Sequence, residues 1–180
     1  MRHKIGTVLC LIVLATLGLE SPPSQGASGW VVFTHPQYGF SLSYPAGWVI
    51  TRPVTPLLVL SIVGPKSAGS SEFQMNVNVV TDSIPVGTSI EQFDAVANEK
   101  LQRIFPGYQL LRTDRTQVGG YPAVLRYTTW HPGVAELYQM QLGVIVVSRL
   151  YVVTGTTLAA STRIREEALL LQRILTTFRP

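Results

Sequence analysis

Four consecutive runs of β-type residues in the second half of the chain constrain its fold more than any other feature. The runs are centred on residues 109–116, 122–129, 136–146 and 150–156. Gly119-Gly120 turns the first run into the second, and Ser148-Arg149 or a longer loop joins the last two. Because strands joined by such short connections pair antiparallel, these runs predict an antiparallel sheet.

The opening segment of the chain predicts a β-hairpin. A short β-type run at 31–34 comes first, and residues 38–45 then alternate between apolar and small polar types. Ala46-Gly47 supplies a turn, and Trp48 starts the return strand. We therefore expect residues 38–45 and 48–50 to pair with each other.

Two further strands are expected before the first helix. Residues 57–63 form a continuous apolar run, which is typical of a strand buried on both faces. Residues 64–71 are expected to form a loop, and their Gly-Pro-Lys-Ser start lacks the spacing of a phosphate-binding loop. Residues 73–80 alternate between apolar and polar types and predict a half-buried strand.

The periodicity changes to that of a helix in two places. Thr88 and Glu91 have the spacing of a capping box, and Pro106-Gly107 ends the first helix. Its apolar face is marked by Ile90, Phe93, Ala97, Leu101 and Ile104. The second helix follows Ser161, and Arg163 can pair with Glu167 across one turn of it. Its apolar face is marked by Ile164, Ala168, Leu171, Leu175 and Phe178.

This order of elements predicts an α+β fold, with a twisted antiparallel β-sheet and helices packed on its faces. Hydrophobic residues make up 46% of the chain and charged residues 13%, so the chain can bury enough surface to fold. We expect residues 28–37 to form a short linker and first strand, and residues 38–180 to form a single domain.

The first 27 residues have the pattern of a secretory signal peptide. Arg2, His3 and Lys4 form a basic start, and residues 5–19 form an uncharged apolar segment. Small residues around Ala27 are suited to cleavage. The alternative is a leader retained as an N-terminal anchor. Both versions predict that the domain works outside the cytoplasm, in the periplasm, at the cell surface or secreted.

Cysteine usage and charge narrow the class of protein further. The single cysteine, Cys10, follows Leu9 rather than the small residue that a lipoprotein signal requires, so we expect no lipid anchor and no disulfide. The formal net charge is +4, and the basic residues are scattered without a run or stripe that could follow a phosphate backbone. The sequence therefore disfavours nucleic-acid binding.

Several short motifs resemble those of one known family. They are Tyr38-Gly39-Phe40-Ser41 with Tyr44-Pro45 and Trp48, Asn76-Val77-Asn78-Val79, Ser89-Ile90 with Phe93, Gly119-Gly120-Tyr121-Pro122, Leu150-Tyr151 and the closing helix to Phe178. In this order they resemble the PsbP-like proteins, relatives of an extrinsic subunit of the photosystem II oxygen-evolving complex. The resemblance covers roughly residues 38–178 and implies an α/β/α sandwich.

The same resemblance implies two kinds of role. Photosynthetic members bind the lumenal side of the photosystem and help to retain calcium and chloride near the manganese cluster, which would place this chain in a thylakoid lumen. Bacterial relatives are exported proteins or lipoproteins. Calcium enters only through this resemblance, because Asp82, Glu91, Asp94, Glu99 and Asp114 do not form the alternating pattern of a calcium loop.

The residues themselves do not form a recognisable catalytic or zinc site. Beyond the leader there are two histidines, His35 and His131, and each precedes a proline. We expect both in exposed turns rather than as general bases or metal ligands. The sequence has no Gly-x-Ser-x-Gly motif. No cofactor is predicted from these patterns, and we expect that the protein is not an enzyme.

One aromatic and charged group stands out as a candidate partner-binding surface. Trp130-His131-Pro132 lies between two β-type runs, close to Tyr127 and Glu136. A surface tryptophan in a loop can anchor a partner, and the alternative is a cap over the edge of the core. Arg126 and Tyr138 on the flanking runs could pair across this hairpin with groups such as Glu136.

Taken together, these patterns favour a non-enzymatic exported binding or accessory protein at the outer face of a membrane. A protein partner at that surface is expected, and the resemblance adds a photosystem II-type extrinsic subunit as one version of the role. The first alternative is a module that binds a small ligand between sheet and helix. The second is a hydrolase, which would need a histidine beside a hydroxyl and a carboxylate.

Overall fold

The computed structural model describes residues 29–53, 55–70 and 72–180. The expected signal peptide, with its alternative as an anchor, lies outside these residues. The described part folds into two sheets and two helices, and it confirms the α+β class with a mostly antiparallel sheet. No helix among the described residues has the length and apolar character needed to cross a membrane.

Nine strands build the two sheets. In chain order they are β1 (Trp30–Thr34), β2 (Ser41–Pro45), β3 (Val49–Thr51), β4 (Leu58–Lys66), β5 (Gln74–Ser83), β6 (Gln109–Val118), β7 (Tyr121–Trp130), β8 (Leu137–Val146) and β9 (Arg149–Leu158). The large sheet has the order β3-β4-β5-β9-β8-β7-β6, and all of its neighbours are antiparallel. β1 and β2 form a separate two-stranded sheet.

The predicted opening hairpin is wrong. β2 pairs with the earlier strand β1, with Phe33 opposite Leu42, whereas β3 pairs with β4 in the large sheet. The turn at Ala46-Gly47 therefore carries the chain from one sheet to the other. Gly47 has φ of 93°, a backbone conformation that glycine adopts without a steric penalty.

Two predictions for the strands that follow need correction. β4 continues to Lys66 and includes Gly64. A glycine is needed at this position of the strand, because a Cβ there would lie 2.4 Å from the indole of Trp48. The expected loop therefore begins after the strand, not at residue 64. β5 is buried on both faces rather than half-buried: Val77 and Val79 lie in the core on one face, and Asn76 and Asn78 on the other face are only 6% and 4% exposed.

A two-residue turn joins β8 and β9. Val146 pairs with Arg149, so Val147 and Ser148 form the turn, one residue earlier than predicted. Val147 has φ of 58°, the left-handed conformation that β-branched residues rarely adopt. Its side chain is 77% exposed, so burial does not compensate for this strain.

The first helix, α1 (Ile90–Ile104), has the predicted extent but a different cap. Ser89 is the N-cap: its Oγ accepts a hydrogen bond from the Gln92 backbone N–H, and Gln92 Oε1 accepts one from the Ser89 N–H. Thr88 instead donates its hydroxyl hydrogen to the carbonyl oxygen of Pro85. The capping box is thus shifted by one residue from the predicted Thr88–Glu91 pair.

The second helix, α2 (Ile164–Thr176), packs closely on the centre of the large sheet. A Cβ on Gly155 of β9 would lie 3.2 Å from atoms of both Leu171 and Leu175, so this glycine allows the helix its close approach. Arg163 pairs with Glu166 rather than the predicted Glu167. Glu167 instead points into the protein, where it is 6% exposed.

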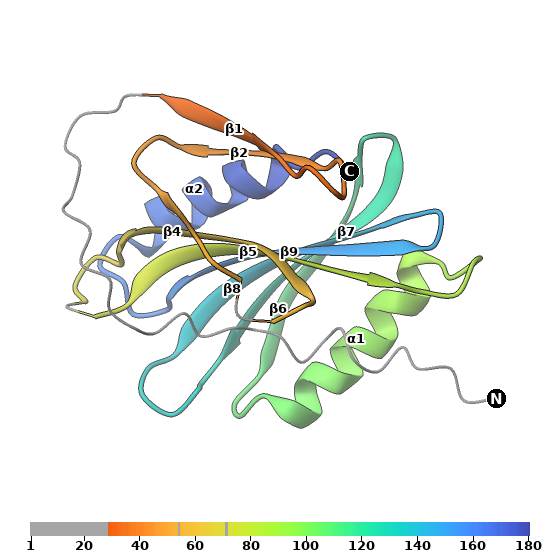
Figure 1. Cartoon of the computed structure of the whole chain (residues 1–180). Coiled ribbons are helices and arrows are strands. Elements are labelled where there is room, and N and C mark those ends of the chain that lie inside the picture. The colour runs from red at the N-terminus through yellow and green to blue at the C-terminus, as the bar shows by residue number, and fades with distance from the viewer. Residues whose placement is uncertain (1–28, 54, 71) are drawn as a thin grey trace.

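The two faces of the large sheet carry different layers (Figure 1). α2 and the small β1–β2 sheet cover one face, and the larger apolar cluster lies between them and the sheet. α1 covers part of the other face with a smaller apolar cluster, which includes Ile90 and Phe93. The edge strand β6 lies beside α2 on one face, and on the other face its Arg115 lies 3.6 Å from Asp94 of α1.

Candidate functional site

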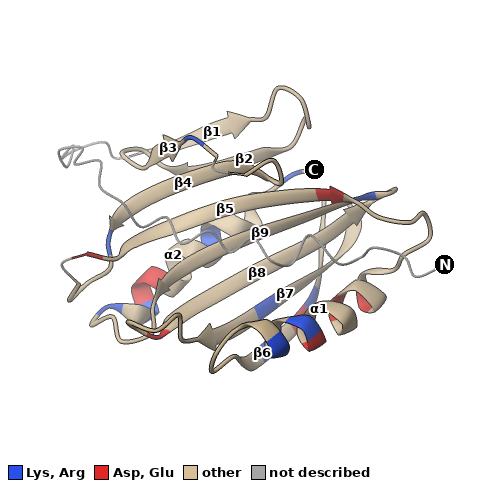
Figure 2. Cartoon of the chain, turned by 60° about the horizontal axis from the view of Figure 1, so that its bottom comes forward, with Lys and Arg blue, Asp and Glu red and all other residues tan. Residues whose placement is uncertain are grey.

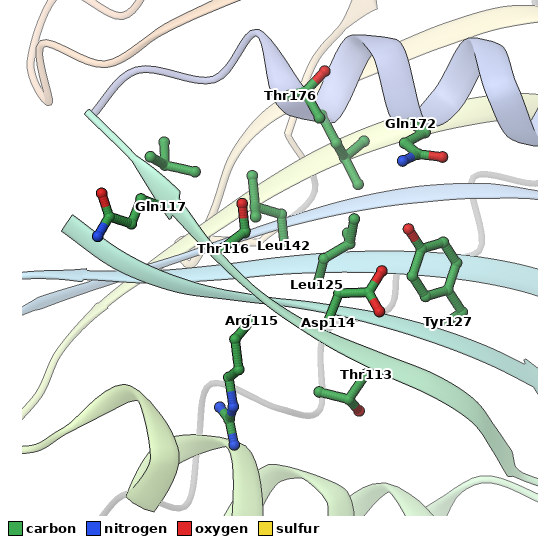
Figure 3. A pocket seen from close by; sticks show the side chains of 12 residues that line it. Thr113, Asp114, Arg115, Thr116, Gln117, Leu125, Tyr127, Leu142, Gln172 and Thr176 are labelled. Atoms are coloured by element: carbon green, nitrogen blue, oxygen red, sulfur yellow. The ribbon is translucent and has the colours of Figure 1, made fainter. Parts of the chain in front are cut away.

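A groove of about 570 Å³ lies between α2 and the edge strand β6 (Figure 3). This volume is within the roughly 300–1,000 Å³ that ligand pockets usually occupy. The apolar part of its wall consists of Val118, Leu125, Leu142 and Leu175. The polar part includes Asp114, Thr116, Gln172 and Thr176. The groove therefore combines an apolar base with hydrogen-bonding groups around it.

Strand alternation explains why these side chains converge. β6 pairs with β7 so that Asp114 lies opposite Leu125 and Thr116 opposite Ala123, both of which belong to the cluster under α2. Because paired residues in an antiparallel sheet share a face, Asp114 and Thr116 also face α2. From the other side, the last turns of α2 supply Gln172 and Thr176.

Arg112 lies outside the groove lining but forms a polar cluster with two residues of the groove wall, Asp114 and Tyr127. The Arg112 guanidinium lies 4.4 Å from the centre of the Tyr127 ring and donates a hydrogen bond of 3.1 Å to its hydroxyl. The same guanidinium pairs with the Asp114 carboxylate. Arg112 and Asp114 remain accessible, with side chains 60% and 39% exposed, so a ligand can reach both charges.

A phenol is already protonated at neutral pH at its ordinary pKa, and burial shifts two tyrosines of this region further in that direction. Burial raises the pKa of Tyr127, and this outweighs the opposing hydrogen bond and charge of Arg112. Burial likewise raises the pKa of Tyr138, with a smaller contribution from Tyr127. Both phenols are therefore protonated at neutral pH and can act as hydrogen-bond donors.

The structure divides the predicted partner-binding residues between two faces of the sheet. Tyr127 faces α2 and lines the groove, whereas Trp130 faces the α1 side and packs on Phe105 with ring centroids 4.4 Å apart. Of the two alternatives for Trp130, the structure supports the cap over the core edge, because its side chain is only 4% exposed. His131 and Glu136 are exposed, and their role in binding a partner stays a prediction.

The two histidines lie in turns. His35 Nδ1 accepts hydrogen bonds from the backbone N–H groups of Gln37 and Tyr38, and its ring is partly buried against Phe40. His131 is exposed, and its Nδ1 accepts a hydrogen bond from the Gly133 N–H. Each ring therefore stabilises its own turn.

Arg126 does not pair across the hairpin as predicted. Its Nε lies 2.7 Å from Oδ1 of Asp94 on α1, and its guanidinium lies 5.6 Å from the centre of the Phe93 ring. Tyr138 faces the opposite side of the sheet, since its partner in the register is Thr129. In the described part of the chain, no three His, Cys, Asp or Glu side chains come together as potential metal ligands.

Sequence reasoning missed most of the groove. Only Tyr127 was singled out as a binding residue, whereas Arg112, Asp114, Gln172 and Thr176 were not. The signal that could have indicated β6 is its polarity on both faces, visible in Arg112-Thr113-Asp114-Arg115-Thr116-Gln117, because such a strand cannot be sandwiched between layers. No local sequence pattern indicates that β6 lies beside Gln172 and Thr176 of α2, about 60 positions later in the chain.

Solved structures with a similar fold define the class of the protein. Cyanobacterial PsbP (CyanoP) from Synechocystis sp. PCC 6803 aligns with a TM-score of 0.63 and 13% identity over 89% of this chain and 98% of that one. LpqN, described as involved in cell envelope biogenesis of Mycobacterium tuberculosis, aligns with a TM-score of 0.61 and 12% identity over 84% and 91%. The Saccharomyces cerevisiae Ran-binding protein Mog1p aligns with a TM-score of 0.61 and 9% identity over 84% and 95%. The chain is thus an α+β protein of the fold that these three share.

A family model makes the assignment more specific. The DcrB model matches residues 66–175, more than half of the chain, and the chain belongs to the DcrB family. The PsbP-like resemblance therefore holds for the fold, while DcrB is the family. No curated protein sequence matches the chain.

Proposed function

We propose that this DcrB-family protein is a non-enzymatic accessory protein that works outside the cytoplasm, at the outer face of a membrane, and binds a protein partner through the α2–β6 groove. The observation that carries the proposal is the groove itself, with buried leucines at its base and the accessible Arg112–Asp114–Tyr127 cluster at its wall. Tyrosine and arginine at the border of an apolar depression are typical of residues that dominate protein interfaces.

Two further observations support the extracytoplasmic part of the proposal. The first 27 residues have the basic start, apolar core and small residues of an export signal. LpqN, which shares the fold, is described as involved in cell envelope biogenesis. A role as a photosystem II-type extrinsic subunit, which the PsbP-like resemblance implies, would apply if the source organism is a phototroph.

A second candidate is a module that binds a small ligand, and the volume of the groove favours it. A cavity of about 570 Å³ can hold a ligand of drug-like size without a protein partner. The same groove residues would be used, so the two candidates differ in what occupies the groove.

Site-specific photocrosslinking in the source organism tests the proposal. A photoreactive amino acid at Gln117, which lines the groove, should give one defined protein adduct, and the same probe at Val86, which is 81% exposed before α1, should not. Arg112→Ala should abolish the adduct, because it removes a cation from the groove cluster. Arg103→Ala should leave the adduct unchanged, because Arg103 is a similarly exposed, ion-paired arginine on α1.

Three outcomes would contradict the proposal. The same adduct at Val86 would show non-specific contact, and an adduct that survives Arg112→Ala would place the interface elsewhere. The absence of any protein adduct at Gln117, together with a small molecule that co-purifies with the protein and is lost in Arg112→Ala, would favour the small-ligand candidate.

A further inference from the structure

β6 forms one edge of the large sheet and is hydrogen-bonded to β7 alone among the described strands. An edge strand directs a row of backbone N–H and C=O groups away from its neighbour. In the described part of the chain, no turn or loop hydrogen bond reaches the backbone of residues 109–118. α1 packs mainly on β7 and β8, and α2 mainly on β9, so both helices lie inward of this edge. The outward backbone of β6 is therefore open to another strand.

The other strand edges offer less to a partner strand. β3, at the opposite edge of the large sheet, spans only Val49–Thr51, and β1 contains no charged residue that could fix a register. Figure 2 shows that the charges on β4, β5 and β9 lie at the strand ends. β6 instead carries Arg112, Asp114 and Arg115 in its middle. It is therefore the edge at which charge can select both a partner and a register.

The charged residues of β6 decide which registers a second copy of the strand could adopt. The side chains of Arg112 and Asp114 are 60% and 39% exposed, so a neighbouring strand can meet both. When two identical strands pair antiparallel about a two-fold axis, the residue at the axis meets its own copy. An axis at Arg112 or at Asp114 brings two like charges opposite each other, which is destabilising. Charges on an edge strand usually prevent pairing in this way.

An axis at Thr113 has the opposite result. Arg112 then comes opposite Asp114 of the second copy, and by symmetry Asp114 comes opposite Arg112 of the second copy. Thr113 meets its own copy, and a threonine pair is a favourable cross-strand contact. Because Arg112 also pairs with Asp114 within each chain, four charges alternate in sign around the axis. A network of this kind stabilises more than an isolated surface ion pair does.

The same register covers an exposed leucine. Leu111 is 53% exposed and lies at a shift in the register between β6 and β7. It comes opposite Arg115 of the second copy, and the aliphatic part of an arginine side chain can cover apolar surface. The regular part of the strand, from Arg112 onward, supplies the backbone groups for the new ladder. Charge, apolar burial and backbone pairing therefore favour one and the same register.

We propose that β6 pairs antiparallel with β6 of a second copy of this chain, about a two-fold axis at Thr113, so that two 7-stranded sheets join into one. The same surface is then used on both copies. The inference concerns the edge of β6 and does not depend on the function proposed for the groove on its α2 face. In the photocrosslinking experiment at Gln117, an adduct of twice the mass of the chain would report this pairing, and any other mass would report a groove partner.

Two charge reversals test the pairing by sedimentation equilibrium of the purified protein. The unmodified protein should show a monomer–dimer equilibrium. Arg112→Asp and Asp114→Arg should each weaken the dimer at least about tenfold, because two like-charge contacts replace two ion pairs. An equimolar mixture of the two variants should form a heterodimer, because every contact between the two strands is then again between opposite charges.

A matched variant and a crosslinking experiment provide the controls. Arg103→Asp should leave dimerisation unchanged, because Arg103 is a similarly exposed, ion-paired arginine on α1. If a charge reversal fails to fold, crosslinking in a Cys10→Ser background decides the question. A short thiol crosslinker should join Thr113→Cys to its copy, since directly opposite residues lie about 5 Å apart. It should not join Gln117→Cys to its copy, since those two positions would lie about 26 Å apart.

Four results would overturn the proposal. The unmodified protein could remain monomeric at its highest soluble concentration, which would leave the edge of β6 to a different partner. The mixture of Arg112→Asp and Asp114→Arg could fail to associate, or Arg103→Asp could weaken the dimer as much as Arg112→Asp does. Equal crosslinking of Thr113→Cys and Gln117→Cys would exclude the register.

Discussion

The two faces of the large sheet differ in what their side chains do. On the α2 side, Val77, Met140 and Val153 at the centre of the sheet are fully buried against α2 and the small sheet. On the α1 side, the residues next to them along the strands are Asn78, Gln139 and Thr154. Both sets are buried, since Asn78, Gln139 and Thr154 are 4%, 1% and 8% exposed. The comparison teaches that the α2 side stabilises the fold through apolar packing, whereas the α1 side buries polar groups beside the strands.

The largest expected effect comes from the α2 side. Phe178 is fully buried, with its ring centroid 5.4 Å from that of Phe40 and 5.6 Å from that of Tyr151. Phe178→Ala should lower the free energy of unfolding by about 3–5 kcal/mol, because it leaves a cavity between three layers. Urea denaturation measures this loss. A loss below about 1 kcal/mol would contradict the assignment of the main core to this side.

Glu167 tests a polar contact on the α2 side. Its carboxylate accepts hydrogen bonds from Thr157, from the Ala68 backbone N–H at 2.7 Å and from Ser67 at 2.8 Å. Glu167→Gln should cost about 2 kcal/mol, because the amide cannot accept all three. The matched control is Glu166→Gln, at a side chain 63% exposed, which should cost less than about 0.5 kcal/mol.

The lowered pKa of the Glu167 carboxylate should make the free energy of unfolding depend on pH. Burial raises the pKa of Glu167, but the hydrogen bonds from Thr157, Ala68, Ser67 and Ser161 together hold it below the usual 4.5. The stabilisation is therefore complete above pH 4.5 and is lost as the pH falls through the lowered pKa of the folded state. Glu167→Gln should flatten this part of the stability profile, and an unchanged profile would exclude Glu167 as its cause.

A pair of neighbouring substitutions compares the two faces directly. Val153→Thr places a hydroxyl in the α2-side core, where Val153 is fully buried, and should cost about 1–3 kcal/mol. Thr154→Val makes the reverse change at the next residue, on the α1 side, and should alter the free energy of unfolding by less than about 0.5 kcal/mol. Thermal and urea unfolding measure both. Equal losses would show that the two faces are equally important for stability.

The smallest expected effect is a gain in stability at the β8–β9 turn. Val147 has φ of 58°, and asparagine tolerates this conformation better than valine. Val147→Asn should raise the free energy of unfolding by about 1 kcal/mol. Val86→Asn is the control, because Val86 is similarly exposed but has no positive φ. A gain of the same size at both positions would show that the effect comes from surface polarity.

The sequence predicted those parts of the fold that strong local patterns determine. The end of α1 at Ile104 follows from Pro106-Gly107, and the antiparallel order of β6 to β9 follows from their short connections. The opening hairpin could not be predicted, because the alternation of apolar and polar residues in β2 is the same whether β2 pairs with β1 or with β3. The choice between these partners depends on contacts with α2, more than 100 residues away.

The candidate site was less predictable than the fold. Tyr127 was identified for its residue type, but its partners come from β6 and α2, and only the strand register brings them together. The two alternatives for Trp130, a surface anchor or a cap over the core edge, could not be separated from the sequence, because a proline two residues later indicates a turn without showing which way the indole points. The buried polar residues that follow one another across the α1 side, such as Asn78, Thr154 and Gln141, become visible only when the strands are paired, which no single stretch of sequence contains.

The proposed function requires the domain to lie outside the cytoplasm, and one measurement tests this most directly. Cells of the source organism are fractionated, and the intact mass of the protein is determined in each fraction. The account predicts recovery in an extracytoplasmic or membrane fraction, either cleaved close to Ala27 or at full length if the leader is an anchor. Full-length protein in the soluble cytoplasmic fraction would contradict the account.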